Sequence, residues 1–229
     1  MGGAALLAAS AALHGGAGRV LVALLDGGHL QLDTQQPELM LRRFDALDLE
    51  HLTVVCGCGG GQAVGRVLAD AIARSARLVL DADALNAIAA APALRALVAA
   101  RSQPTVLTPH PLEAARLLGL ATAQVQADRL GAAQQLARQF HCVAVLKGSG
   151  TVIAAPHRVP AINPTGNARL ATAGTGDVLA GLIGARLAAG ASALRAARAA
   201  VYAHGLAADD WPEGQALTAS ALARSLAPA

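Results

Sequence analysis

The chain has 229 residues and a mass of 22.8 kDa, with 54% hydrophobic residues, 14% charged residues and a mean hydropathy of +0.45. This composition excludes a disordered chain, a coiled coil and a collagen-like repeat, and the length predicts one domain spanning residues 1–229. The formal net charge is +3, but the arginines are scattered rather than gathered in a basic block, and only 2% of residues are aromatic. We therefore expect no nucleic-acid partner and no membrane partner.

Two rare residue types narrow the expectations further. Lys147 is the one lysine among 18 basic residues, which suggests a need for a compact ammonium group there, with chance retention at the surface as the alternative. Cys56, Cys58 and Cys142 are too few for a disulfide framework and lack the spacing of a structural zinc site. We expect them to be small buried apolar residues in a reducing cytoplasm. The apolar N-terminus has no basic start and is interrupted by Ser10, so we expect neither a signal peptide nor a membrane span.

Apolar periodicity alternates between helical and strand spacing, which predicts an α/β protein with a mostly parallel central sheet flanked by helices. In the first half we expect helices at Gly3–Leu13, Gln62–Arg74, Asp83–Ala90 (capped by Asp83) and from Pro92, and strands at Arg19–Leu25, Leu52–Cys56, Arg77–Leu80 and Pro104–Leu107. In the second half we expect helices at Pro111–Leu118, Ala123–Phe140, Gly176–Ala189, Ala193–Ala208 and Thr218–Leu226, and a hairpin of Val143–Lys147 with Thr151–Ala155. Doubly wound folds usually open with a strand, so either a leading strand is missing or this fold starts with a helix.

The strongest local signal is the run Ala-Gly-Thr-Gly-Asp at 173–177, followed at once by an apolar helix. Gly174, Thr175 and Gly176 let backbone N–H groups approach an anion, and the helix N-terminus adds a partial positive charge. This segment therefore predicts a phosphate site. Asp177 is an ordinary helix-dipole partner in a purely structural interpretation. In a phosphate site its carboxylate is a candidate base toward a hydroxyl that accepts a phosphoryl group.

A second signal is the turn that follows the predicted strand ending at Lys147. Gly148, Ser149 and Gly150 come next, before Thr151, and this arrangement suits a nucleotide phosphate or ribose lying against the backbone. A plain hairpin turn with an exposed lysine is the alternative.

Three further runs follow predicted strands. His110 lies between two prolines, with Glu113 in the first turn of the next helix, and a plain strand-to-helix loop is the alternative. Asp81 and Asp83 are either a helix cap with a solvated neighbour or ligands for Mg²⁺ or a substrate hydroxyl. The cluster Cys56–Gly61 lacks the full dinucleotide-binding spacing but allows a close backbone approach to a ligand. Because ligands bind at the carboxyl ends of strands in open α/β sheets, we expect all five sites to converge.

In their order and spacing, the runs Thr108–Glu113, Leu146–Thr151, Asp81–Asn86 and Ile162–Asn167 with Ala173–Gly181 resemble the NAD(P)H-hydrate dehydratase family. This family is a carbohydrate-kinase-related group with a ribokinase-like fold, and the resemblance covers nearly the entire chain. It implies a three-layer α/β/α architecture and a repair enzyme that removes water from the hydrated nicotinamide ring of NADHX or NADPHX while hydrolysing ADP or ATP. It also implies Mg²⁺ at the phosphates and a homo-oligomer.

The resemblance further implies a role for each site residue. Asp177 is the base toward the substrate hydroxyl, and the backbone of Gly174–Gly176 stabilises the transferring phosphoryl group. The implied nucleotide-binding residues are Lys147, Gly148, Ser149, Gly150, Thr151, Gly174, Thr175 and Gly176. The implied substrate-binding residues are Ala4, Gly59, His110, Glu113, Asn163 and Asp177. No metal ligand from the protein is implied.

The sequence departs from the family pattern in three ways. The strand and glycine-rich loop that usually precede the first helix are not found, so we expect one edge of the substrate site to be affected. Cys58 and Gly60 stand where Pro and Leu are typical, and Leu112 stands where Gly is typical. The epimerase domain fused in many relatives is also not found, so we expect action on one epimer only. A small-molecule kinase of the same fold and a nucleotide-binding protein without turnover remain the alternatives.

Overall fold

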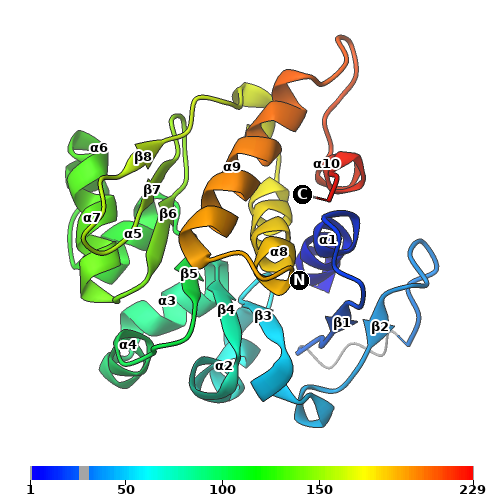
Figure 1. Ribbon diagram of the computed structural model, residues 1–229, viewed down its shortest axis with the longest axis horizontal. Coiled ribbons are helices and arrows are strands. Elements are labelled where there is room, and N and C mark those ends of the chain that lie inside the picture. The colour runs from blue at the N-terminus through cyan, green and yellow to red at the C-terminus, as the bar shows by residue number, and fades with distance from the viewer. Residues whose placement is uncertain (1, 26–30, 229) are drawn as a thin grey trace.

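The computed structural model describes residues 2–25 and 31–228 of the chain. Its centre is a six-stranded sheet with the strand order β3-β4-β5-β6-β7-β8 (Figure 1). The strands are β3 (Thr53–Cys56), β4 (Arg77–Leu80), β5 (Thr105–Leu107), β6 (Val143–Leu146), β7 (Val152–Ala154) and β8 (Ala161–Ile162). Strands β3 to β6 run parallel and β7 and β8 join antiparallel, which confirms the mostly parallel sheet and the expected hairpin of β6 and β7.

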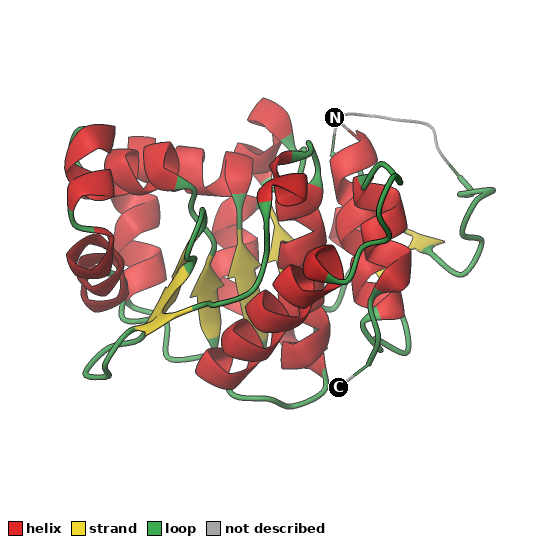
Figure 2. Cartoon of the chain, turned by 90° about the horizontal axis from the view of Figure 1, so that it is seen from above, coloured by secondary structure: helices red, strands yellow, loops and turns green. Residues whose placement is uncertain are grey.

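Helices cover both faces of this sheet and produce three layers (Figure 2). One face is packed by α1 (Gly2–His14), α8 (Thr175–Ala188), α9 (Ala193–Asp209) and α10 (Ala219–Ser225). The other face is packed by α2 (Leu68–Arg74), α3 (Ala82–Ala90), α4 (Pro92–Ala99), α5 (Pro111–Leu118), α6 (Thr122–Ala127) and α7 (Arg129–Gln139). The three-layer α/β/α architecture is therefore confirmed.

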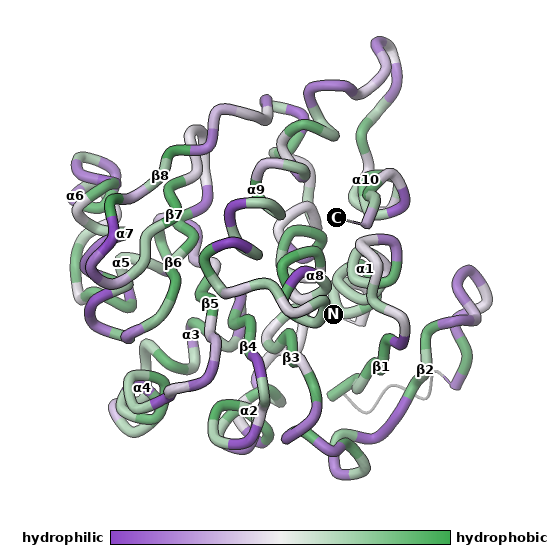
Figure 3. Tube along the Cα trace, in the orientation of Figure 1, coloured by the Kyte–Doolittle hydropathy of each residue, from purple (hydrophilic) through white to green (hydrophobic). Residues whose placement is uncertain are grey.

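Alternating side chains of the central strands separate two hydrophobic cores. In β4, Leu78 and Leu80 belong to the core under α2 to α7, whereas Val79 belongs to the core under α1, α8, α9 and α10. All three side chains are fully buried, as expected for a parallel strand that is covered on both faces. Hydrophobic residues accordingly run through β6 and β7, while the loop between α9 and α10 is hydrophilic (Figure 3).

Helices α1 and α8 approach each other closely enough for their backbones to touch. A Cβ atom at Gly181 would lie 2.0 Å from the carbonyl oxygen of Ala8, so only glycine lets the two helices meet there. Gly184 faces strand β3, where a Cβ atom would lie 2.5 Å from a methyl group of Val55. These contacts hold α8 against both the sheet and α1, and so fix the place of its N-terminus.

Beside β3 the structure differs from the sequence-based expectation. The strand predicted at Arg19–Leu25 is reduced to β1 (Leu21–Val22), which pairs in parallel with β2 (Met40–Leu41) in a separate two-stranded sheet. Within residues 2–25 and 31–228, β3 is therefore an edge of the central sheet. A mostly apolar cavity of about 330 Å³ lies between β3, β1 and α1. Strands β2 and β8 were not predicted, because two residues are too short to show periodicity.

Two predicted helices have different bounds in the structure. The single helix expected at Ala123–Phe140 is divided into α6 and α7, because Asp128 ends α6 and then caps α7 by accepting the N–H of Gly131 at 2.8 Å. The segment Gln62–Arg74 begins as a 3₁₀ helix, Gly61–Arg66, before α2.

Two expectations from composition can also be compared with the structure. Cys56, Cys58 and Cys142 are free and buried, as predicted. In the part of the chain that the structure describes, no single helix is long and apolar enough to cross a bilayer. Helices α3 and α4 meet that criterion only as a pair, and they are bent by 112°.

Candidate active site

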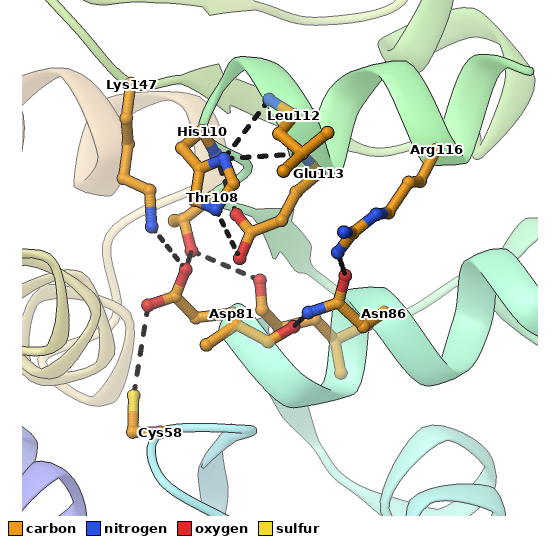
Figure 4. Close-up of polar contacts among 11 residues, drawn as sticks. Cys58, Asp81, Asn86, Thr108, His110, Leu112, Glu113, Arg116 and Lys147 are labelled. Carbon is orange, nitrogen blue, oxygen red and sulfur yellow. Dashed lines mark hydrogen bonds and ion pairs between the residues drawn. The ribbon is translucent and has the colours of Figure 1, made fainter. Parts of the chain in front are cut away.

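Polar side chains gather at the carboxyl ends of the parallel strands. Asp81 follows β4, Thr108 follows β5 and Lys147 follows β6, while Cys58 lies two residues after β3. These four side chains point toward one another although they come from distant parts of the sequence (Figure 4). In an open α/β sheet this edge is where ligands bind.

A buried ion pair lies at the centre of this group. The ammonium Nζ of Lys147 lies 2.6 Å from Oδ1 of Asp81, whose side chain is 2% exposed. The hydroxyl of Thr108 donates to the same oxygen at 2.8 Å. Burial alone lowers the pKa of Lys147, but the carboxylates of Asp81 and Glu113 outweigh it, so the pKa is raised and the ammonium stays charged. The one lysine of the chain is therefore held by a buried pair and is not an incidental surface residue.

The N-terminus of α8 lies directly beside this ammonium. A Cβ atom at Gly176 would lie 3.4 Å from Nζ of Lys147, so the ammonium lies within contact distance of this turn. Gly174 precedes the helix with a φ of 91°, a left-handed conformation that favours glycine. The N-terminus of the helix and the ammonium thus offer positive charge to one anion.

Hydrogen bonds from Thr175 and His204 hold the first turn of α8. The hydroxyl of Thr175 donates to the carbonyl oxygens of Leu170 and Thr172 at 2.7 and 2.9 Å. Nε2 of His204, on α9, donates to the carbonyl oxygen of Thr175 at 2.9 Å. Burial lowers the pKa of His204 to about 4, so the ring is neutral at physiological pH. The protein's own hydrogen bonds therefore hold this turn in place.

Asp177 lies in the same first turn and is half-buried. Burial raises the pKa of its carboxyl to about 6, with a contribution from Asp81 and Asp83, while a hydrogen bond from Cys58 and the charge of Lys147 act in the opposite direction. A carboxylate with a pKa near 6 is ionised at pH 7 and yet takes up a proton readily, which are the properties of a general base.

His110 and Glu113 form a capping box at the start of α5. Nδ1 of His110 accepts the N–H groups of Leu112 and Glu113 at 3.2 and 3.3 Å, and the Glu113 carboxylate accepts the N–H of His110 at 2.8 Å. Nε2 of His110 also lies 3.3 Å from Glu113. The Glu113 side chain is buried, which raises its pKa, whereas His110 is exposed. The pair thus presents one imidazole to solvent, held by a buried carboxylate.

The turn at 148–151 is braced by a distant arginine. Gly148 and Gly150 have φ values of 136° and 60°, and Ser149 is exposed between them. A guanidinium nitrogen of Arg129 donates to the carbonyl oxygens of Leu146 and Lys147 at 3.2 and 3.3 Å. The hydroxyl of Thr151 donates to the carbonyl oxygen of Gly148 at 2.9 Å, and so it closes the turn.

The glycine cluster after β3 packs against the start of α3. A Cβ atom at Gly57, whose φ is 116°, would lie 1.9 Å from the carbonyl oxygen of Asp81. The N–H of Gly61 donates to the carboxylate of Asp83 at 2.7 Å. The expectation that Asp83 caps its own helix was wrong, because Asp81 occupies that position and Asp83 holds the glycine loop instead. Ala82, between the two aspartates, has a φ of 47°, which is strained for a residue other than glycine.

The remaining predicted substrate residues lie in the surrounding elements. Ala4 is in α1, where it packs partly against the core around α8, and Gly59 is in the loop after Cys58 with a φ of 67°. Asn163 uses its side-chain amide within its own loop, where it donates to the carbonyl oxygen of Thr165 at 2.8 Å. The structure thus brings Lys147, Gly176 and Asp177 together most directly, and leaves Asn163 occupied by a local hydrogen bond.

Three residues contribute to the candidate site in ways that the sequence did not predict. Thr108 was seen in its motif, but its bond to Asp81 depends on the register of β5 with β4. Cys58 was expected to be only a small apolar residue, and it faces Asp81 and Asp177. His204 lies in the alanine-rich helix α9 and is buried. In the sequence, the signal for it was a histidine on an otherwise apolar helix face.

One cluster has the residue types of a metal site. Donor atoms of Cys58, Asp81 and Asp177 all lie within 4.8 Å of one another. Mg²⁺ prefers oxygen ligands in octahedral geometry, whereas this set includes a protonated thiol and already contains the ammonium of Lys147. The cluster therefore does not fit Mg²⁺.

Comparison with known proteins identifies the family. The family model described as NAD(P)H-hydrate dehydratase matches residues 1–228. The chain belongs to the NAD(P)H-hydrate dehydratase family. It is 43% identical over 236 residues to the ADP-dependent (S)-NAD(P)H-hydrate dehydratase of Neisseria meningitidis, covering 100% of this chain and 79% of that protein. It spans about two fifths of the length of the bifunctional NAD(P)H-hydrate repair enzymes that it also matches.

Solved structures of relatives show the same fold. The ADP/ATP-dependent NAD(P)H-hydrate dehydratase of Bacillus subtilis, co-crystallised with ATP/Mg²⁺ and soaked with CoA, is 30% identical, with a TM-score of 0.77 over 97% of this chain and 84% of that one. A ribokinase-like superfamily protein of Enterococcus faecalis is 26% identical, with a TM-score of 0.80 over 98% of this chain and 81% of that one. The ribokinase-like fold is therefore confirmed.

Proposed function

We propose that this chain removes water from the hydrated nicotinamide ring of NADHX or NADPHX, and that it consumes ADP or ATP in the process. One observation carries this proposal: the ammonium of Lys147, the N-terminus of α8 and the carboxylate of Asp177 lie together at the carboxyl edge of the sheet. The ammonium and the helix N-terminus suit phosphate groups, and the carboxylate suits removal of the proton from a hydroxyl that attacks phosphorus. Membership in the dehydratase family supports the choice of the hydrated ring as the substrate.

The proposed reaction balances in two steps. Asp177 takes the proton of the ring hydroxyl, whose oxygen attacks the terminal phosphorus of the nucleotide, and the bond from that phosphorus to the rest of the nucleotide breaks. The ring carbon–oxygen bond then breaks and phosphate leaves, while a proton is lost from the adjacent ring carbon and the double bond is restored. Phosphorylation is useful here because phosphate is a far better leaving group than hydroxide.

The binding residues have distinct proposed roles. Lys147 and the amides of Gly174–Gly176 bind the phosphate chain, and they stabilise charge that develops on the transferring group. The turn of residues 148–151 lies against the rest of the nucleotide. His110, held by Glu113, reaches the hydrated dinucleotide, together with Ala4, Gly59 and Asn163. Mg²⁺ would neutralise phosphate charge and would be held by phosphate oxygens and water, since the acid–thiol cluster does not suit it.

The decisive test is the Asp177→Asn variant. Purified protein with ADP or ATP, Mg²⁺ and NADHX is expected to regenerate the absorbance of reduced nicotinamide, and the variant is expected to lose at least about a hundredfold in kcat because it lacks the base. Asp70→Asn, the same change at an exposed site on α2, is the control and should match the parent. Full activity of Asp177→Asn would remove the proposed base.

The products separate this function from its alternatives. Phosphorus NMR should show free phosphate in proportion to the reduced nicotinamide formed. A stable phosphorylated alcohol would instead indicate a small-molecule kinase. Nucleotide binding in calorimetry without phosphate release would indicate a binding protein without turnover.

We propose in addition a single domain that assembles as a homo-oligomer in the cytoplasm. Ile162, in the outer strand β8, and Val159, shortly before that strand, are 59% and 83% exposed, and apolar side chains at a sheet edge suit a contact between copies. The three free cysteines suit a reducing compartment. Light scattering after size-exclusion chromatography measures the mass of the particle in solution, and the mass of a monomer would contradict the proposed homo-oligomer.

A further inference from the structure

Cys58 lies between two carboxylates of the candidate site. Its Sγ lies 4.0 Å from Oδ2 of Asp81 (Figure 4), and donor atoms of Cys58, Asp81 and Asp177 lie within 4.8 Å of one another. The side chain is buried, with 8% exposed. The thiol is therefore close to both carboxylates.

Burial and charge keep this thiol protonated. Burial raises the pKa of Cys58 well above its usual range, the charges of Asp81 and Asp177 raise it further, and Lys147 only partly opposes them. A neutral S–H is a weak donor, and an ionised carboxylate is a strong acceptor. Cys58 therefore acts as a hydrogen-bond donor and not as a nucleophile.

The backbone on both sides holds the thiol in place. Gly57 packs against the carbonyl oxygen of Asp81 with no room for a side chain, and the N–H of Gly61 is bound by Asp83. Cys58 lies between these two anchors, so the backbone from which its buried side chain projects is held in place.

The other partners of Asp81 leave one of its carboxylate oxygens to the thiol. Lys147 and Thr108 both bind Oδ1 of Asp81, so that Oδ2 alone faces Cys58. Four groups act on the charge of the Asp177 carboxylate: Cys58 and Lys147 favour the ionised form, whereas Asp81 and Asp83 are like charges that oppose it. Among these, Cys58 is the neutral donor, and its Sγ lies within 4.8 Å of a carboxylate oxygen of Asp177.

We propose that Cys58 is a positioning residue for Asp177: its thiol, shared with Asp81, holds the Asp177 carboxylate in the orientation from which it accepts the proton of the substrate hydroxyl. The inference rests on the proposed function, because it takes Asp177 as the base. A hydrogen bond to an ionised carboxylate favours that form, so loss of the thiol should make Asp177 harder to ionise.

The experiment compares pH profiles of kcat/KM for the parent, Cys58→Ala and Cys58→Ser. Cys58→Ala should move the acidic limb to higher pH by about half a unit and lower kcat more than it changes KM for the nucleotide. Cys58→Ser retains a donor and should lie between the parent and the alanine variant. Cys142→Ala is the matched control, because Cys142 is an equally buried free cysteine in the core on the opposite face of the sheet. It should follow the parent.

A second readout does not depend on activity. Carboxyl-labelled aspartate in the full chain allows the titration of Asp177 to be followed by NMR, with Asp177→Asn assigning the signal. The pKa of Asp177 should rise in Cys58→Ala. If the alanine variant does not fold, the same rise is expected in Cys58→Val, which fills the space of the thiol with an apolar side chain. A titration that is unchanged in the donor-free variant overturns the inference. If Asp177→Asn retains full activity, the proposed function fails instead, so the two failures can be told apart.

Discussion

At the scale of single residues, Asp177 combines a chemical role with an energetic penalty. The pKa of its carboxyl is about 6 in the folded chain, mainly because burial disfavours the charge, whereas 3.8 is the reference value for an exposed aspartate. Folding thus favours the protonated form. The contribution to stability is present below pH 3.8 and is lost as the pH rises through 6, so the ionised group opposes folding at neutral pH.

Asp177→Asn should therefore be more stable than the parent at neutral pH. We expect a gain on the order of 1 kcal/mol in the free energy of unfolding at pH 7.5, because solvent screens this half-buried group. The gain should shrink toward pH 4, where the parent carboxyl is protonated as well. Urea denaturation at the two pH values measures it, and an equal difference at both would contradict the raised pKa.

The sequence predicted residues whose role follows from local spacing, and it failed where the partner is remote. Helix α5 begins at Pro111 with Glu113 in its first turn, as predicted, and the glycines before Asp177 are adjacent to their helix. The bond of Lys147 to Asp81 joins residues 66 positions apart, and that of Cys58 to Asp81 joins residues 23 apart. Such contacts depend on strand order and register, which periodicity does not determine.

At the scale of elements, glycines determine how closely the helices pack. Helix α8 meets α1 at Gly181, where a Cβ atom would lie 2.0 Å from a carbonyl oxygen of the partner helix. Long helices and buried strands were predicted because their apolar pattern extends over several residues. The division at Asp128 and the two-residue strands β2 and β8 were not, because a cap inside a helical pattern and a very short strand give weak signals.

Gly181→Ala is expected to destabilise the protein by about 2 kcal/mol, since α1 and α8 must separate. The expected destabilisation is the net effect, and it has the opposite sign to the usual gain of about 1 kcal/mol when alanine replaces glycine in a helix. Gly3→Ala, on the exposed face of α1 with nothing within 4 Å of the added methyl group, is the control. Thermal unfolding should show a clear fall in Tm for the first variant and no fall for the second. Equal melting temperatures would contradict the close helix packing.

At the scale of the whole molecule, the order of strands β3 to β6 brings four sequence motifs to one edge, and the packing of α8 adds the fifth. The alternation of helix and strand patterns was enough to predict this convergence, because parallel strands share an orientation. The separate sheet of β1 and β2, and the apolar cavity beside β3, were not predicted, because periodicity shows that a strand exists and not which neighbour it joins.

A crystal structure with ADP and Mg²⁺ bound tests the central claim most directly. We expect the terminal phosphate within hydrogen-bonding distance of the amides of Gly174–Gly176 and of the Lys147 ammonium, with the Asp177 carboxylate facing the phosphorus across the space for a hydroxyl. Phosphates bound away from both Lys147 and the N-terminus of α8 would contradict the account.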